Sequence, residues 1–472
     1  MKDSNFFNSF KYCLSDSSYL ITQTFRLLES FKAKGLYQHH HTRFNRTYLI
    51  QVMVFFRLIN FSSIFSIIES SYSQLLPMGK DVIYSMLNSD WINWRKLLYG
   101  QIEDNMSELE HPKSTTQSHQ VPCLILDDTD IPKRGKCIEW IGKIFSHLNH
   151  QYLLGFKALH VACWTGNTLV HLDFSLHVEM GKKNTQGISS KQASKRFSKQ
   201  RNQSSHAYKR ESELHETKIH CAIKMISQAV ANKLTFKYIL FDSWFFNKRM
   251  ISTIFELGSL FITRPKLNHW KYFHKGKHYT IGELIKKYKN NKHRKYSRKL
   301  SLYYLSIPVE FGGIQLSLLL YKPKVRGAKW QILISNDVGI NAIKAYEIYR
   351  TRWAIEVSFK ELKQNLNYGK CQSRNFAAQI AHTTISLLTY NYLSLIKAVN
   401  EHQTIGGLFS EIKANTITPN VMVMFWGQVF EFLKKFAKTI ETSVDFLIEK
   451  FIHDNDFLLF LSQIRFSIIP ET

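Results

Sequence analysis

Short apolar runs of strand length, separated by turns and by one amphipathic helix, constrain the fold of this chain most. Three such runs come first: "VPCLILDD" (121–128), "GFKALHVACW" (155–164) and "TLVHLDFSLHV" (168–178). An amphipathic helix, "ETKIHCAIKMISQAVAN" (216–232), precedes a fourth run, "FKYILFD" (236–242). Each run has the length and the β-branched or aromatic content of a buried strand. The order predicts a mixed sheet: three antiparallel strands, a helix, and a fourth strand beside the first.

Carboxylates lie at the ends of two of these runs. Asp128 closes the first run, Asp242 closes the fourth, and a helical segment further along carries Glu356. The ends of neighbouring strands lie together, so a helix packed over them would add the third carboxylate. Three carboxylates at one point raise one another's pKa unless cations are present. Hard divalent cations meet that need, and Mg²⁺ is the usual choice beside phosphates, so we expect these residues to be catalytic metal ligands.

The first aspartate is ambiguous from the sequence. The stretch "LDDTD" contains Asp127, Asp128 and Asp130. Alternation along a strand places Asp128 on the face of Leu126 and Asp127 on the face of Ile125. That pattern alone does not choose between the two.

A polar stripe runs along the segment "YEIYRTRWAIEVSFKELKQNL" (346–366), which we expect to be one helix. Its members are Tyr349, Arg352, Glu356 and Lys363. At 100° per residue these four fall within about 60° of one another. Apolar residues border the stripe on both sides, and we expect those margins to pack against the sheet. We expect the stripe itself to face DNA.

The charge of the chain indicates a polyanionic partner. The 472 residues carry a formal net charge of +27, which favours nucleic acid first and an anionic membrane surface second. Residues 182–210 contain nine Lys or Arg and no Asp or Glu, which predicts a flexible basic loop. Within it we expect Lys195, Arg196, Lys199 and Arg201 to bind DNA. No apolar run near the start is long enough for a membrane span or a signal peptide, and six scattered cysteines are typical of reduced thiols in a cytoplasm.

Changes in composition divide the chain into six regions. We expect a helical N-terminal region (1–103), a linker (104–120), a first α/β part (121–263), a β-rich basic region (264–328), a second part with the glutamate helix (329–377), and a helical C-terminal region able to dimerise (378–472).

The four-residue pattern Y-x2-R-x3-E-x6-K, with "LILDDTDIPKRGK" and "YILFDSWF", resembles the insertion sequence four family of bacterial DDE transposases. The resemblance implies an RNase H-like mixed sheet flanked by helices, with a β-rich insertion before the glutamate helix. By the same resemblance, residues 1–103 would bind DNA ends, and residues 121–263 and 329–377 would form one catalytic core interrupted by the insertion at 264–328. It implies Asp128, Asp242 and Glu356 as ligands of Mg²⁺, with Mn²⁺ as a substitute. Tyr349, Arg352 and Lys363 would grip DNA phosphates, and Trp330 would stack on a flipped base.

The same resemblance implies a reaction and partners. The reaction would be cut-and-paste transposition in a bacterial cytoplasm: nicking, hairpin formation and opening, and strand transfer. The partners would be double-stranded transposon ends, target DNA and a second copy of the chain. Two alternatives stay open, which are a nuclease on the same fold that cuts without strand transfer and a domesticated relative that only binds DNA.

Overall fold

The computed structural model describes residues 36, 44–58, 63–70, 73, 76, 78–104, 121–147, 149–179, 186–288, 294–325, 327–400, 404–414, 433–454 and 456. Most of the expected linker at 104–120 and Lys182 and Lys183 of the expected basic loop lie outside these residues.

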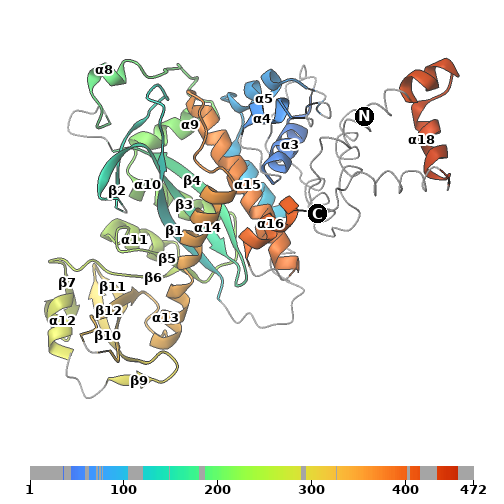
Figure 1. Cartoon of the computed structure of the whole chain (residues 1–472). Coiled ribbons are helices and arrows are strands. Elements are labelled where there is room, and N and C mark those ends of the chain that lie inside the picture. The colour runs from blue at the N-terminus through green and yellow to red at the C-terminus, as the bar shows by residue number, and fades with distance from the viewer. Residues whose placement is uncertain are drawn as a thin grey trace.

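One mixed sheet of twelve strands organises the described chain (Figure 1). Its order is β2-β3-β1-β5-β6-β12-β11-β10-β7-β8, with β4 paired to β3 and β9 paired to β10. The strands are β1 (Cys123–Pro132), β2 (Gly142–Ser146), β3 (Gln151–Trp164), β4 (Leu169–His177), β5 (Tyr238–Phe241), β6 (Leu260–Thr263), β7 (Lys271–His274), β8 (Lys277–Thr280), β9 (Lys295–Ser297), β10 (Leu302–Phe311), β11 (Ile314–Pro323) and β12 (Gln331–Ser335).

The predicted strand arrangement is confirmed. β3 pairs antiparallel with β1 and with β4, and β5 pairs parallel with β1. Helix α10 (Lys218–Ala231) makes the crossover from β4 to β5 and begins at Thr217, whose side chain accepts a hydrogen bond from the His220 amide. Two details differ from expectation: β1 continues to Pro132, beyond both aspartates, and β2 adds a short strand to the far end of β3.

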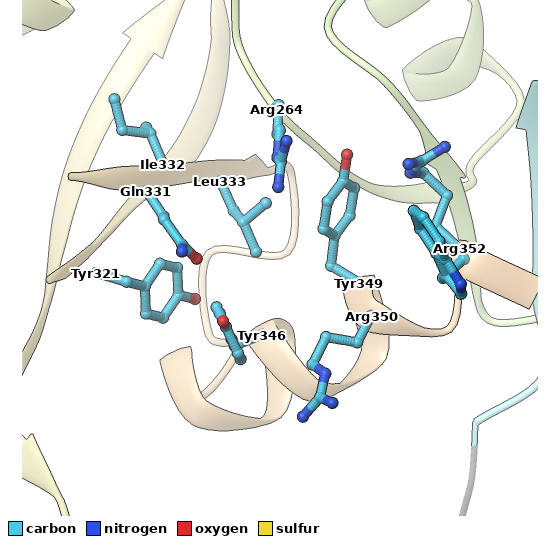
Figure 2. A pocket seen from close by; sticks show the side chains of 10 residues that line it. Arg264, Tyr321, Gln331, Ile332, Leu333, Tyr346, Tyr349, Arg350 and Arg352 are labelled. Atoms are coloured by element: carbon cyan, nitrogen blue, oxygen red, sulfur yellow. The ribbon is translucent and has the colours of Figure 1, made fainter. Parts of the chain in front are cut away.

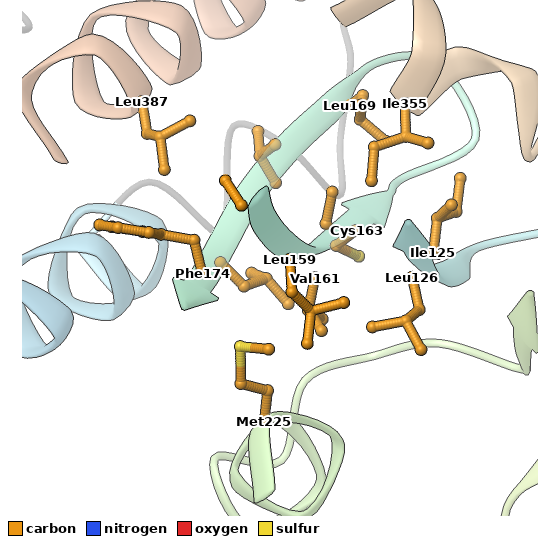
Figure 3. Packing of buried hydrophobic residues seen from close by; sticks show 14 of the residues in the cluster. Ile125, Leu126, Leu159, Val161, Cys163, Leu169, Phe174, Met225, Ile355 and Leu387 are labelled. Carbon is orange, nitrogen blue, oxygen red and sulfur yellow. The ribbon is translucent and has the colours of Figure 1, made fainter. Parts of the chain in front are cut away.

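Helices cover both faces of the core strands. α14 and α15 contact β4 on one face, and α10 contacts β3 and β4. Figure 3 shows Ile355 of α14 above Ile125 of β1 and Met225 of α10 below Leu159 and Val161 of β3, so the two helices lie on opposite faces of the sheet. The other described helices are α3 (Arg46–Leu58), α4 (Ile64–Ile68), α5 (Lys80–Leu87), α6 (Trp94–Asp104), α8 (Ser190–Ala193), α9 (His206–Ser212), α11 (Lys248–Glu256), α12 (Ile281–Tyr288), α13 (Ala342–Arg350), α14 (Trp353–Asn365), α15 (Phe376–Asn400), α16 (Ile405–Ala414) and α18 (Val444–Ile452).

The helix expected over 346–366 is divided into α13 and α14. Thr351 and Arg352 lie at the division, and both keep right-handed α backbone angles. Tyr349, Arg352 and Lys363 all contact β1 or the end of β5, so the polar stripe continues across the two helices.

The strands between β6 and α13 extend the same sheet. β12 pairs antiparallel with β6, and β11, β10 and β7 follow outward from it. The mixed sheet flanked by helices is consistent with the expected RNase H-like fold. No helix in the described parts of the chain combines the length and the apolarity needed to cross a membrane.

Candidate active site

Adjacent aspartates of β1 point to opposite faces of the sheet. Asp127 accepts a hydrogen bond from the Arg352 guanidinium at 2.6 Å, on the face covered by α14. Asp128 forms an ion pair with Lys218, at the start of α10, on the opposite face. Strand alternation separates the two carboxylates in this way because β1 runs straight through them. Asp127 therefore shares a face with Glu356, and Asp128 does not.

Asp242 follows directly after β5. The parallel register pairs Ile125 with Leu240, so two residues further on Asp127 and Asp242 are level. The Asp242 carboxylate accepts a hydrogen bond from the Trp244 amide at 2.9 Å. Burial raises the pKa of Asp242, and the charge of Asp128 adds to that rise. The parallel register thus brings the second aspartate beside the first.

The polar stripe contacts the ends of β1 and β5. The Tyr349 hydroxyl donates to the Phe241 carbonyl at 3.3 Å, and the Lys363 ammonium donates to the Thr129 hydroxyl at 2.7 Å. The Arg352 guanidinium bridges Asp127 and Glu356. The stripe therefore points toward the strand ends and their carboxylates, and its contact with DNA stays a prediction.

Only one of the two apolar margins is packed. Ile355, Phe359, Leu362 and Leu366 are buried, whereas Trp353 is 62% exposed and Val357 is 41% exposed. Tyr349 is itself buried, at 8% exposed. The margin that carries Trp353 and Val357 is thus open to a partner.

Asp127 has the most perturbed carboxyl of the group. Its pKa is raised to about 7, mainly by burial and also by the charges of Asp128 and Asp242, while the Arg352 guanidinium opposes the rise. A buried carboxyl with a pKa near neutrality, next to two other acids, is typical of functional sites.

The donor set suits a hard divalent cation, although one cation already lies within it. Asp127, Asp242 and Glu356 supply the carboxylate oxygens that such ions prefer. Within the described residues, no three His, Cys, Asp or Glu side chains converge closely enough to hold a metal ion as they stand. The Arg352 guanidinium lies between Asp127 and Glu356 and supplies one positive charge to the two carboxyl groups. A metal ion would have to replace this internal cation.

A pocket of about 340 Å³ adjoins the stripe (Figure 2). Strands β11 and β12 form one side, and helix α13 with the start of α14 forms the other. Its lining joins aromatic rings and guanidinium groups: Tyr321, Tyr346, Tyr349, Trp353, Arg264, Arg350 and Arg352. Such a lining suits a flat, polar ring attached to an anion.

Trp330 lies apart from that pocket. It precedes β12, is partly buried, and has the Lys322 ammonium 5.7 Å from its ring centroid. It does not line the pocket. Its predicted role in base stacking stays a prediction.

The described part of the predicted basic loop is largely structured, and the structure contradicts the prediction that Arg201 binds DNA. The Arg201 guanidinium is completely buried and pairs with Glu139, Glu211 and Asp90. It is therefore unavailable to a phosphate, because three carboxylates from other segments already surround it.

The other three cations predicted to bind DNA, Lys195, Arg196 and Lys199, differ in their contacts and exposure. Arg196 donates to the Ile141 carbonyl at 3.0 Å and to Gln186, and Lys199 pairs with Asp90 at 2.5 Å. Lys195 is exposed. DNA binding by these three residues stays a prediction.

Sequence reasoning missed Lys218, which pairs with Asp128, and Arg264, which lines the pocket. The parallel pairing of β1 with β5 was predicted, but the register that sets Asp127 level with Asp242 comes from the structure. The choice of Asp128 as the first metal ligand stays a prediction. Lys218 and Arg264 gave no local signal, because each meets the site only through the fold.

Two protein-family models match the chain. Residues 199–392 match a transposase DDE domain, and residues 84–294 match a DDE superfamily endonuclease. The two matches support a DDE transposase family. No curated protein matches the chain. The family supports a transposase-like function in DNA recombination and implies DNA as the substrate, and DDE superfamily enzymes use divalent metals.

Proposed function

We propose that this chain is a bacterial transposase of the insertion sequence four branch that moves a DNA element by metal-assisted phosphoryl transfer. The observation that carries the proposal is a set of three carboxyl groups: one on β1, one directly after β5 in the chain, and one on α14. The Arg352 guanidinium joins the first and the third. The pattern of Tyr349, Arg352, Glu356 and Lys363 supports the branch. The reaction would be cut-and-paste transposition by a homodimer in the cytoplasm.

We assign the metal ligands to Asp127, Asp242 and Glu356. Supporting this choice, Asp127 is level with Asp242 and shares Arg352 with Glu356, whereas Asp128 is paired with Lys218 on the other face. Bound there, a pair of Mg²⁺ ions, or Mn²⁺ in their place, would activate the attacking oxygen and stabilise the leaving oxygen.

Each stripe residue would then have its own role. Arg352 can exchange a carboxylate for a DNA phosphate, because its planar guanidinium binds either anion with two hydrogen bonds. Tyr349 holds the end of β5 in front of Asp242, and Lys363 fixes β1 to α14. These two are therefore positioning residues for the carboxylates.

The pocket beside α13 supports the hairpin pathway. A hairpin needs a sharply bent strand at the cut end, and bending displaces a base from its stack. Aromatic rings and guanidinium groups can hold such a base by stacking. Arg264, Tyr346 and Trp353 could do so from the walls of the pocket.

A labelled DNA duplex that ends in the inverted repeat flanking the gene tests the proposal. In Mg²⁺, Asp127→Asn, Asp242→Asn and Glu356→Gln should each reduce cleavage about a hundredfold to a thousandfold, the scale expected when an electrostatic catalytic group is lost. End binding should change little. Asp128→Asn is the matched control and should cut. If Asp128→Asn abolishes cleavage while Asp127→Asn cuts, the assignment reverts to Asp128.

A nuclease without strand transfer is the second candidate, favoured by the match to a DDE superfamily endonuclease over residues 84–294. The same assay decides between them once a target plasmid is added. Joining of the labelled 3′ end to the plasmid supports a transposase, and cleavage without joining supports the nuclease.

A further inference from the structure

A row of aromatic and cationic side chains crosses four neighbouring strands of the insertion. Tyr303 of β10 lies opposite Tyr296 of β9 on one side and opposite Lys322 of β11 on the other. Tyr321 pairs with Gln331, so the register continued by one residue sets Lys322 beside Trp330. Partners in an antiparallel register share a face of the sheet. The row is therefore Tyr296, Tyr303, Lys322 and Trp330.

The outer rings of this row are open. Tyr296 is 41% exposed and Tyr303 is 36% exposed, with ring centroids 5.0 Å apart and planes inclined by 52°. β9 lies at the lower edge of the molecule in Figure 1, below α13. The two tyrosines thus present part of their ring faces at an edge of the protein.

Cations accompany each aromatic ring of the row. Arg294 lies 5.9 Å from the ring centroid of Tyr303, Lys324 lies 5.7 Å from that of Tyr296, and Lys322 lies 5.7 Å from that of Trp330. The surrounding segment 264–299 holds thirteen Lys or Arg and one acid, Glu283. A polyanion is the complementary partner for this surface.

We propose that this row is a stacking platform for a single strand of DNA. Neighbouring strands are about 4.8 Å apart, so four positions span roughly 14 Å, enough for several unpaired bases. Aromatic rings on a sheet bind unpaired bases by stacking, while cations beside them follow the phosphates. A duplex does not fit this recognition, because its base faces are covered by their own neighbours.

A cross-strand tyrosine pair can also serve only to stabilise the pairing of two strands. This purely structural role differs from a DNA-binding role in what it requires of the neighbouring residues. Packing alone would involve the two tyrosines and would not require a cation at every ring of a four-strand row. The DNA partner is taken from the proposed function, but the platform lies outside the carboxylate cluster. Its binding can therefore be measured without cleavage.

The experiment measures binding of the full chain to a fluorescent twelve-residue thymidine oligonucleotide and to a duplex of equal length, by anisotropy without metal. Tyr296→Leu with Tyr303→Leu should weaken oligonucleotide binding about tenfold, since each stacked base contributes measurably. Duplex binding should change less than about twofold. The Phe double variant keeps the ring faces and should bind within about twofold of the unaltered chain.

Tyr152→Leu is the matched control, because Tyr152 is also a strand tyrosine, 61% exposed, that contacts another ring, Phe145. It should not change oligonucleotide binding. An unchanged affinity in the Leu double variant would overturn the proposal, as would an equal loss for oligonucleotide and duplex.

Photocrosslinking of an iodouracil oligonucleotide to the unaltered chain, with mass-spectrometric mapping, covers the case in which the Leu variant fails to fold. Crosslinks at Tyr296 or Tyr303 support the platform, and crosslinks found only elsewhere overturn it. If the oligonucleotide binds these tyrosines but the chain does not cut DNA ends, the transposase proposal fails and the platform stands. Cutting of DNA ends without tyrosine-dependent binding would support the transposase and overturn the platform.

Discussion

At the scale of single residues, the Asp127 carboxyl is subject to opposing influences. Burial favours its protonated form, whereas Arg352 favours the ionised form, and the pKa settles at about 7. A metal ligand must be ionised. Because the folded pKa is raised, protonation stabilises the fold at low pH, and that contribution is lost as the pH rises from about 4 to about 7.

Metal affinity should therefore follow the titration of Asp127. In the absence of DNA, binding of Mn²⁺ should be about tenfold weaker at pH 6 than at pH 8, since one proton must leave a group with a pKa near 7. Electron paramagnetic resonance of free Mn²⁺ measures this affinity directly.

Arg352→Ala provides the control for this titration. The guanidinium lowers the pKa of Asp127, so its removal should shift the midpoint of metal binding to a pH above 7. A midpoint that does not move would show that Asp127 is not the titrating ligand.

At the scale of elements, Arg201 joins four segments that are distant in sequence. Its guanidinium donates to Glu139 before β2 at 2.6 Å, to Glu211 of α9 at 2.7 Å, to Asp90 between α5 and α6 at 3.1 Å, and to Asn375 before α15 at 3.0 Å. Glu139 is itself buried. This cluster fixes the segment after α8 against the core.

Arg201→Gln should lower the free energy of unfolding by about 3 to 5 kcal/mol, because it leaves a buried carboxylate without its cation. Urea unfolding followed by circular dichroism measures the change. Lys195 is exposed on the same segment, so Lys195→Gln is the control. Its free energy of unfolding should stay within about 0.5 kcal/mol of that of the unaltered chain. If Arg201→Gln lowers the free energy of unfolding by less than about 1 kcal/mol, the carboxylates of Glu139, Glu211 and Asp90 find other partners.

At the scale of the whole molecule, the net charge of +27 makes DNA binding salt-dependent. The nine Lys or Arg of residues 182–210 overstate the number of side chains that can contact DNA, because Arg201 and Arg210 are buried in ion pairs. Lys191, Lys195 and Lys209 are exposed cations of the same region and are left to contact phosphates.

The double variant Lys191→Gln with Lys195→Gln should reduce the steepness of the slope of log affinity against log salt concentration. The reduction should be up to about 1.8, since each lost phosphate contact lowers the slope by about 0.9. Anisotropy titrations at several salt concentrations give the slope. Lys224→Gln is the control, because Lys224 pairs with Glu216, and its slope should not change. An unchanged slope in the double variant would mean that this region points away from DNA.

The sequence by itself determined the core strands β1, β3, β4 and β5 and the helix α10. The strands appear as short continuous apolar runs and the helix as an apolar stripe at helical spacing, and both signals depend only on near neighbours in the chain. It missed β2, whose five residues GKIFS contain no continuous apolar run.

Only the tertiary structure decided the orientation of the functional side chains. Asp127 lies beside Arg352 and Asp128 beside Lys218 because α14 covers one face of β1 and α10 the other. Arg201 is buried because its acidic partners come from segments far along the chain. An isolated strand has two equivalent faces, and a charge has no partner until distant segments meet. Packing removes both ambiguities at once, since burying a charge without its counterion costs several kcal/mol.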